Sequence, residues 1–221
     1  MFKIFLWRFS FEMISLLKRL GFKGPVVKYF TYGGNLDPKV LEHRQIKILA
    51  RQNYVLENFR FAFNHRIPFE GAAMASIEPA PQSKVFGVIY DIKYIDLLRL
   101  DCFEAAWFIR GYLRKLFLTE ENDRVYYYES NRKKEGLKPP KAYIDKILNG
   151  YRLAYPEQLD LINKLAAMPS MPNMDPMATP HFLNNNYERF GAVLAPYFAA
   201  YDRRCVKLFA LLIFRPSIFE K

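Results

Sequence analysis

The sequence predicts an α+β protein: a small mixed β-barrel flanked by helices, with further helical segments at both termini. The first indication is strand-like alternation of apolar and polar residues, which begins at Val26. The second is a set of stretches rich in aromatic and β-branched residues, at 55–63, 72–77, 85–92, 112–118 and 124–129. Five or six short strands of this kind suit a small barrel.

Four helices are expected among these strands, over 38–44, 93–103, 141–148 and 156–166. The first has a clear start, because Asp37 can act as the N-cap and Pro38 occupies the first helical position, where no backbone N–H is needed. Strands and helices continue without a linker up to residue 167. We therefore expect one domain over residues 26–167.

Residues 1–25 form an apolar, basic segment that we expect to be an amphipathic helix. A membrane-spanning helix needs about 20 mostly uncharged apolar residues, and Arg8 and Glu12 interrupt this stretch near its middle. The small-residue pattern of a cleaved signal peptide is missing as well. The helix can pack on the domain, on a partner or on a membrane surface.

Residues 168–182 are rich in methionine and proline, which favours a linker because proline ends helices and central strands. Residues 183–221 follow as a second apolar, basic segment, expected to be a helical extension that bends or ends at Pro196. Both ends of the chain therefore suit either a mutual cap on the domain or an in-plane anchor on an anionic membrane surface.

The composition favours a reducing compartment and gives no support for a metal site. The 221 residues include two cysteines and three scattered histidines, which form neither a disulfide framework nor a close metal-ligand spacing. We expect a cytoplasmic protein, with peripheral membrane attachment as an alternative. The formal charge of +11 attracts nucleic acid, anionic lipid or acidic substrates. Because no nucleic-acid-binding motif accompanies this charge, no specific nucleic acid is expected.

The turn Tyr32-Gly33-Gly34-Asn35 lies between the first strand and the first helix. Two glycines leave the backbone free to adopt positive φ and allow a ligand to approach the main chain. Successive N–H groups, together with the following helix N-terminus, then suit a carboxylate or an oxyanion. By itself the Gly-Gly pair also fits an ordinary strand-to-helix turn.

Glu104 follows the helix expected over 93–103, beside Phe103 and Trp107. These apolar neighbours are expected to shield the carboxylate partly from water, a setting in which glutamate can take up and return a proton. A surface glutamate is the alternative for this residue alone.

In this order, these segments resemble the gamma-glutamylcyclotransferase family. The similarity covers residues 27–166 and combines the YGGN turn with a G-x-A-x-I type segment at 71–77, a GV-x-Y strand at 87–90 and an L-x-x-L-D-x-x-E helix end at 97–104. Residues 139–150 are similar to the closing P-x-x-x-Y-x-x-x-I-x-x-G helix of that family.

The resemblance implies an enzyme that needs neither water nor a cofactor and that belongs to glutathione-related metabolism. The α-amine of a γ-glutamyl compound attacks its own γ-carbonyl, which releases 5-oxoproline and an amino acid, an amine or a peptide. Glu104 is then the general base and, later, the general acid. The implied substrate-binding residues are Tyr32, Gly33, Gly34, Asn35 and Leu36, through main-chain N–H groups, and Tyr143, through its hydroxyl, unless Tyr143 is simply a core aromatic.

One departure from the family concerns Gly34, which stands where serine is usual. If the serine hydroxyl binds substrate, affinity or preference changes here; if only the backbone matters, nothing is lost. The alternative function is a catalytically inactive cyclotransferase-fold module for binding or for membrane-associated interaction. The sequence leaves the particular γ-glutamyl substrate and the oligomeric state open.

Overall fold

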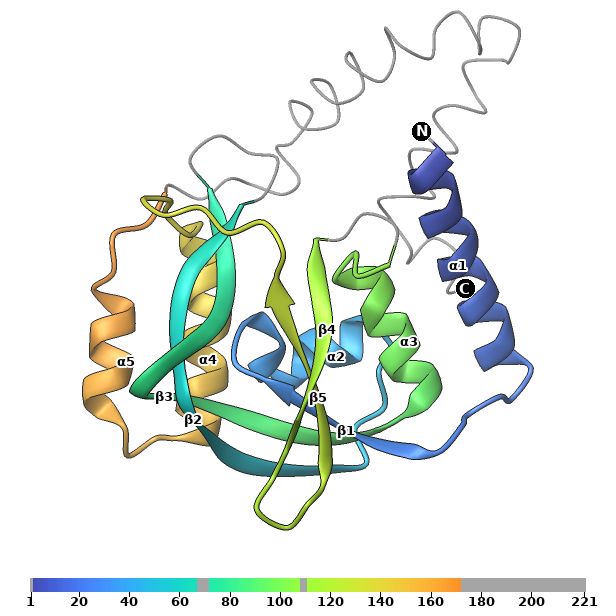
Figure 1. The fold of residues 1–221 in the computed structure, drawn as a ribbon, viewed down its shortest axis with the longest axis horizontal. Coiled ribbons are helices and arrows are strands. Elements are labelled where there is room, and N and C mark those ends of the chain that lie inside the picture. Colours follow the sequence, from blue (N-terminus) through green and yellow to red (C-terminus); the bar gives the residue numbers. More distant parts are fainter. Residues whose placement is uncertain (1, 67–71, 108–110, 172–221) are drawn as a thin grey trace, which may run out of the picture. The chain divides into compact units, whose positions relative to one another are not determined.

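A mixed five-stranded sheet forms the centre of the computed structural model, which describes residues 2–66, 72–107 and 111–171. The strands are β1 (Val26–Thr31), β2 (Ala50–Arg66), β3 (Ala73–Lys93), β4 (Tyr112–Leu118) and β5 (Arg124–Ser130). Their order in the sheet is β2-β3-β1-β5-β4 (Figure 1). Strand β1 therefore lies between β3, to which it is antiparallel, and β5, to which it is parallel.

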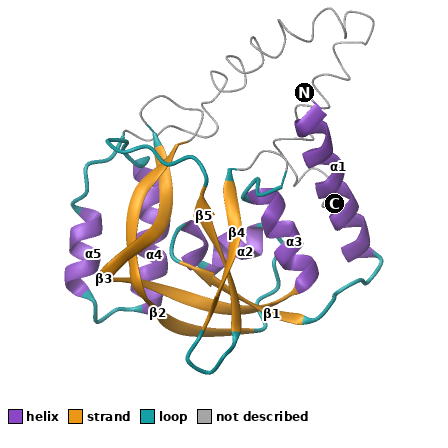
Figure 2. Cartoon of the chain, viewed as in Figure 1, coloured by secondary structure: helices purple, strands orange, loops and turns teal. Residues whose placement is uncertain are grey.

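The predicted α+β class is confirmed by this arrangement of helices around a mixed sheet (Figure 2). The sheet has an open strand order, in which β2 and β4 are the two edges within the described residues. The strands expected to form a barrel therefore form a mixed sheet, and closure of this sheet into a barrel is not observed among the described residues.

The longest pairing in the sheet is the antiparallel hairpin of β2 and β3, which runs from Ala50 opposite Asp91 to Arg66 opposite Ala73. The expectation of two separate strands at 72–77 and 85–92 is wrong, because β3 continues through Pro79. The register of the two strands shifts at a bulge between Glu57 and Phe59. Asn58 and Gln82 both adopt positive φ there, and the Gln82 N–H donates to the Asn58 side chain at 3.2 Å.

The core contains a close approach between β1 and β3. Phe30 of β1 is fully buried, and its ring lies where a side chain at Gly87 would be, since a Cβ there would come within 2.3 Å of the ring. The Phe30 ring also packs edge to face on Tyr54 and Phe117, from the two edge strands. Because position 87 is glycine, the large Phe30 side chain has room to pack against residues of both edge strands.

The remaining described elements are helices: α2 (Pro38–His43), α3 (Tyr94–Phe103), α4 (Lys141–Ala154), α5 (Leu159–Ala166) and the short 3-10 turn η1 (Gly34–Leu36). The predicted start of α2 is confirmed, since the Asp37 side chain accepts from the Lys39 N–H at 3.0 Å and Pro38 follows it. Helices α4 and α5 lie on one side of the sheet, and α3 lies on the other (Figure 1).

Helix α1 (Phe2–Arg19) runs beside α3 (Figure 1). Its Phe11 and Ile14 are buried in a small cluster with Ile95 and Cys102 of α3. Several of its apolar side chains remain exposed, namely Phe9, Met13 and Leu16, and so does Leu20, just after the helix. No helix in the described ranges is long and apolar enough to cross a membrane.

The chain after α5 turns back toward the start of α4. The Met171 N–H donates to the Pro139 carbonyl at 2.9 Å, and the Met171 carbonyl accepts from the Lys141 N–H at 3.1 Å. The rest of the expected linker (168–182) and the whole expected extension (183–221) lie outside the described residues.

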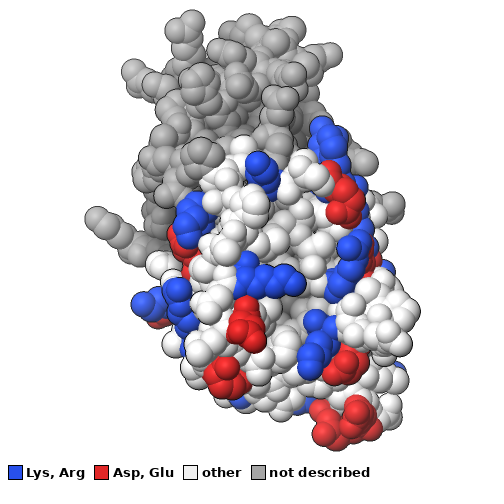
Figure 3. Space-filling model, turned by 90° about the vertical axis from the view of Figure 1, so that its left-hand side faces the viewer, with Lys and Arg blue, Asp and Glu red and all other residues white. Residues whose placement is uncertain are grey.

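Charge is mixed on the molecular face seen in Figure 3. Lysine and arginine side chains there are interspersed with aspartate and glutamate side chains. No broad patch of a single sign covers the described part of this face. The excess of basic residues therefore does not by itself define a docking surface in this view.

Candidate active site

The loop after β1, the end of α3 and the start of α4 meet around a cavity of about 430 Å³. Six of the seven residues predicted for the site line it: Tyr32, Gly33, Gly34, Asn35, Glu104 and Tyr143. The fold thus brings together side chains and backbone from three distant stretches of the sequence.

Glu104 is the carboxylate of this cavity, and its side chain is 15% exposed. Its Oε1 accepts a hydrogen bond from Arg44 Nη1 at 2.7 Å and a longer one from Asn35 Nδ2 at 3.3 Å. The same Asn35 amide also donates to the Tyr29 hydroxyl at 2.8 Å. The expected partial shielding of Glu104 from water is therefore present, together with a cationic partner that the sequence did not indicate.

The position of Glu104 is set by how α3 ends. Glu104 is the C-cap, and the Ala106 N–H donates to the Asp101 carbonyl at 2.8 Å while the Ala105 N–H donates to the Cys102 carbonyl at 3.1 Å. This pair of hydrogen bonds forms a Schellman cap, which requires a residue in the left-handed conformation, usually glycine. Here Ala105 fills that place with φ of 50°.

The glycines of the turn serve a different purpose from the expected one. Gly33 has φ of −117°, and among the described glycines only Gly21, Gly24 and Gly136 have positive φ, so the interpretation based on left-handed backbone is wrong. Because Gly33 and Gly34 have no side chain, the ring of Tyr143 can instead pack directly against the turn. A Cβ on Gly33 would lie 3.1 Å from the Tyr143 hydroxyl oxygen, and one on Gly34 would lie 3.0 Å from its ring.

Tyr143 reaches the cavity from the first turn of α4. Its hydroxyl accepts a hydrogen bond from the Ala75 N–H at 3.3 Å. Burial raises the pKa of Tyr143 to about 12, with the nearby Glu104 carboxylate acting in the same direction. The hydroxyl is therefore protonated at neutral pH and retains a hydrogen to donate.

Leu36 is the predicted site residue that does not line the cavity, and its assignment needs correction. Its side chain is fully buried in the core. Its N–H donates to the Gly33 carbonyl at 2.9 Å within the 3-10 turn, and its carbonyl accepts from the Tyr90 hydroxyl at 3.0 Å. Because the N–H is already used inside the protein, Leu36 positions the turn rather than a ligand.

Tyr32 lies in the cavity wall with its hydroxyl directed into the protein. The hydroxyl donates to the Tyr128 carbonyl at 2.5 Å, and the residue is 5% exposed. Burial raises the pKa of Tyr32 well above its usual value. Its side chain thus fixes the turn against β5, and only its main chain remains suited to ligand binding.

Arg44 is the main functional candidate that sequence reasoning missed. It is the C-cap of α2 and also lines the cavity. Its guanidinium carbon lies 4.8 Å from the centroid of the Phe103 ring, a cation–π distance. Sequence offered no signal, because an arginine at the end of a predicted helix is typical of an exposed face.

The backbone of Arg44 is held from the rear by α1 and α3. The Arg99 Nε–H donates to the Arg44 carbonyl at 2.7 Å, and Arg99 Nη1 donates to Ser15 Oγ at 2.7 Å. Lys18 of α1 adds a bond to the Gln45 carbonyl and an ion pair with Asp96 at 2.5 Å. The N-terminal helix therefore supports the segment that carries Arg44.

Further cations surround the cavity. Arg66, Arg132 and Lys146 are among its lining residues, whereas Glu104 is its only acidic lining residue in the described part of the chain. The local field therefore favours ligands that carry negative charge. No group of three histidine, cysteine or acidic side chains suited to a metal ion occurs among the described residues.

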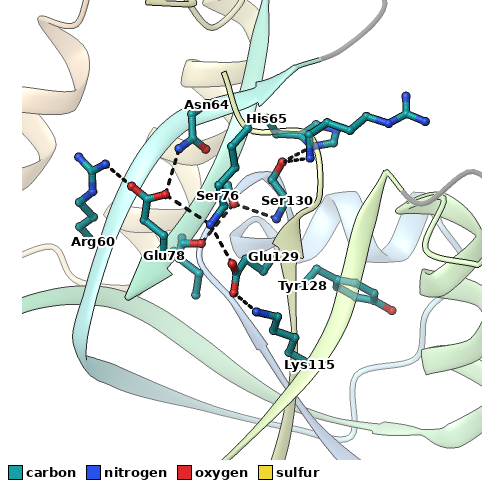
Figure 4. A network of polar contacts seen from close by, with 12 residues as sticks. Arg60, Asn64, His65, Ser76, Glu78, Lys115, Tyr128, Glu129 and Ser130 are labelled. Carbon is teal, nitrogen blue, oxygen red and sulfur yellow. Dashed lines mark hydrogen bonds and ion pairs between the residues drawn. The ribbon is translucent and has the colours of Figure 1, made fainter. Parts of the chain in front are cut away.

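A network of ion pairs holds the strands behind the cavity (Figure 4). Glu78 of β3 pairs with Arg60 and Lys133, and Glu129 of β5 pairs with Lys133 at 2.8 Å and Lys115 at 2.7 Å. Burial acts to raise the pKa of Glu129, but its hydrogen bonds to the two lysines outweigh this and lower it.

His65 connects this region to the cavity wall. Its Nδ1 lies 2.8 Å from Ser130 Oγ (Figure 4). Its ring stacks on Tyr112 with a centroid distance of 3.9 Å. Burial, together with the positive charge of Arg132, lowers the pKa of His65 to about 4. The imidazole is therefore neutral at physiological pH and stiffens the wall.

Taken together, a mixed sheet, a glycine turn and one partly shielded carboxylate in a cation-rich cavity make this a candidate small-molecule site of an α+β protein. Solved structures place that fold more closely. A gamma-glutamyl cyclotransferase superposes with a TM-score of 0.52 at 19% identity, over 66% of this chain and 90% of that one. A human protein described as uncharacterized superposes with a TM-score of 0.52 at 20% identity, over 66% of this chain and 89% of that one.

YkqA from Bacillus subtilis gives a TM-score of 0.53 at 20% identity, and the match spans 66% of this chain but 56% of YkqA. Comparisons with protein-family models and with curated protein sequences return no match. The chain therefore has the gamma-glutamylcyclotransferase-like fold, as the resemblance of its motifs predicted.

Proposed function

We propose that the protein is a gamma-glutamylcyclotransferase-like enzyme that releases 5-oxoproline from a γ-glutamyl compound, with Glu104 as the general acid and base. The observation that carries the proposal is the position of Glu104 in the same cavity as the turn 33–35. Both of its hydrogen bonds fall on Oε1. Within the described residues, Oε2 is thus the oxygen left for a proton of the substrate.

The reaction asks little of the protein beyond shape and proton transfer. The attacking amine and the γ-carbonyl belong to one molecule, so a cavity that folds the substrate into a ring-like conformation already provides proximity. The γ-carbonyl oxygen gains negative charge as the N–C bond forms, and the main-chain N–H groups of Gly33, Gly34 and Asn35 are suited to receive it.

Proton balance explains why one carboxylate is sufficient. The α-ammonium loses two protons on becoming the N–H of 5-oxoproline. The departing nitrogen gains two as the C–N bond breaks and it leaves as an ammonium ion. A single glutamate that alternates between accepting and donating can carry both, and Glu104 faces the cavity in which both nitrogens must lie.

The charge of the cavity supports a choice among leaving groups. Arg66, Arg132 and Lys146 lie in its lining and favour a leaving group that carries a carboxylate. A γ-glutamyl amino acid or peptide meets this condition, whereas a γ-glutamylamine does not. We therefore rank amino acids and peptides above simple amines as leaving groups.

A panel assay tests the proposal. The purified protein is incubated with γ-glutamyl-L-alanine, glutathione and γ-glutamylethylamine, and 5-oxoproline is followed by mass spectrometry. Glu104→Gln is expected to reduce turnover by about 10²- to 10⁴-fold, the range of general acid–base catalysis. Glu42→Gln, on the exposed side of α2, is the matched control and should retain full activity.

Two results would contradict the proposal. Absence of 5-oxoproline from every compound would remove the enzymatic assignment altogether. Full activity of Glu104→Gln would keep the enzyme but exclude Glu104 as its base.

A further inference from the structure

We infer that Arg44 and Glu104 together recognise the α-amino acid head of the substrate, Arg44 binding the α-carboxylate and Glu104 the α-ammonium. The inference rests on the proposed function, because it assigns the two charges of a γ-glutamyl head to two side chains of the same cavity. It adds a specificity-determining residue, Arg44, to the site.

The first argument is complementarity of charge. An α-amino acid carries its ammonium and carboxylate on one carbon, so a matching receptor needs an anion and a cation side by side. Arg44 Nη1 and Glu104 Oε1 are 2.7 Å apart, and both side chains line the cavity. Within the described residues, no other cavity-lining acid is present to form such a pair.

The second argument is the hydrogen-bonding capacity that the pair retains. Guanidinium has five N–H donors, and the contact with Glu104 uses Nη1. Both contacts of Glu104 fall on Oε1. Nη2 and Nε of Arg44 and Oε2 of Glu104 have no hydrogen-bond partner among the described residues, and these are the atoms that a zwitterion requires.

The third argument is preorganisation. Arg44 is half-buried, its guanidinium lies 4.8 Å from the Phe103 ring centroid, and its carbonyl is fixed by Arg99 at 2.7 Å. A side chain held in this way loses little conformational entropy when it binds a ligand. A second hydrogen bond to Glu104, from Asn35, fixes the carboxylate as well.

Binding changes the partners without leaving a charge uncompensated. The empty cavity holds one Arg44–Glu104 pair, and the occupied cavity would hold Arg44 with the α-carboxylate and Glu104 with the α-ammonium. Both states are neutral overall, which avoids the high cost of an unpaired buried charge. The α-carboxylate also weakens the hold of Arg44 on Glu104, so the base is released when a substrate with the correct head arrives.

The experiment compares ligands that differ only in the α-carboxylate. Turnover is measured with γ-glutamyl-L-alanine and with 4-aminobutyryl-L-alanine, which lacks that group and closes to a pyrrolidinone. The proteins are the wild type, Arg44→Met, Arg44→Lys and the control Arg152→Ala, whose arginine is exposed on α4.

Arg44→Met is expected to raise KM for γ-glutamyl-L-alanine by about 10- to 100-fold, the effect of losing a charged hydrogen bond. KM for 4-aminobutyryl-L-alanine should change by less than about 3-fold, because that ligand makes no contact with Arg44. Arg44→Lys should restore part of the discrimination, and Arg152→Ala should behave as wild type. An equal loss on both substrates would mean a merely structural role and would overturn the inference.

Calorimetry with L-glutamate and 4-aminobutyrate provides a readout without turnover. Preference of the wild type for L-glutamate, lost in Arg44→Met, supports the inference even if no compound is cyclised and the proposed function fails. Equal or absent binding of the two ligands to the wild type overturns it. If both Arg44 variants fail to fold, this wild-type comparison alone decides.

Discussion

The ring of Tyr143 lies in the space that a side chain at position 34 would occupy. A Cβ on Gly34 would be 3.0 Å from Cε2 of Tyr143, closer than ordinary van der Waals contact. The serine that is usual at this position in the resembling family therefore competes with Tyr143 in this chain. The two positions form a coupled pair.

Gly34→Ser is expected to destabilise the protein by about 1–3 kcal/mol, the usual range for an overpacked site. In the background of Tyr143→Ala the same substitution should cost clearly less, because the ring is gone. Urea unfolding of the two single variants and the double variant measures this coupling. If the stability losses of the two single variants simply added in the double variant, the contact between position 34 and the Tyr143 ring would not be the cause of the destabilisation.

Gly150→Ala is predicted to be more damaging. A Cβ on this residue of α4 would lie 2.3 Å from Leu36 Cβ and 2.8 Å from the Leu36 carbonyl carbon, so the helix must move away from η1. We expect a loss of stability of at least about 2 kcal/mol and a fall in activity, since the same turn carries Gly33 and Gly34. Asn149→Ala, on the exposed side of the same helix, is the control, and an equal effect of the two would argue against the close contact.

Ala105→Gly is expected to stabilise the protein. Ala105 has φ of 50°, a conformation that costs about 1–2 kcal/mol for a residue with a Cβ. Glycine removes this strain but makes the unfolded chain more flexible by about 0.4–1 kcal/mol, so the net gain is on the order of 0.5 kcal/mol. Ala106→Gly, where φ is not positive, should lose stability instead; a loss in both variants would contradict the strained cap.

Two buried groups have opposite effects on the pH dependence of stability. Burial raises the pKa of Asp101 from 3.8 to about 6, although Arg114, Tyr128 and Trp107 act against it. The folded protein thus binds this proton more tightly than the unfolded chain does. The contribution of Asp101 to the free energy of unfolding is therefore present in acid and is lost as pH rises from about 4 to about 6. For His65, with its pKa lowered from 6.5 to about 4, the contribution instead grows between about pH 4 and 6.5.

Each contribution amounts to about 3 kcal/mol at 1.36 kcal/mol per pKa unit, so the two largely cancel in the wild type. Asp101→Asn should therefore become more stable as pH rises from 4 to 6.5, and His65→Gln should become less stable. Unfolding in urea at a series of pH values measures both slopes. Parallel profiles for the two variants would show that the groups do not titrate as their burial implies.

Much of the fold was predictable because it depends on local patterns. Alternation and residue type located β1, β4 and β5, and the capping residue Asp37 located the start of α2. The continuity of β3 was not predictable, because Pro79 normally indicates a break. Only the long pairing with β2, together with the bulge at Asn58 and Gln82, allows the strand to continue.

The site was predictable to the extent that motifs describe the main chain. Sequence similarity located the turn and Glu104, which the fold brings to one cavity. It gave the wrong reason for Gly33 and Gly34, because the approach of Tyr143 from α4 is a tertiary contact. Arg44 and the burial of Leu36 were missed or misjudged for the same reason, since neither follows from spacing along the chain.

The parallel pairing of β1 with β5 has a consequence for how the protein acquires activity. Lys28 is registered with Val125, so this contact joins parts of the chain that are made far apart in time, whereas β2 and β3 form a hairpin of neighbours. Long-range pairing is slow because a large loop must close first. During refolding, the hairpin should therefore gain protection from hydrogen exchange before the cavity exists, and ligand binding should return only with the slowest phase.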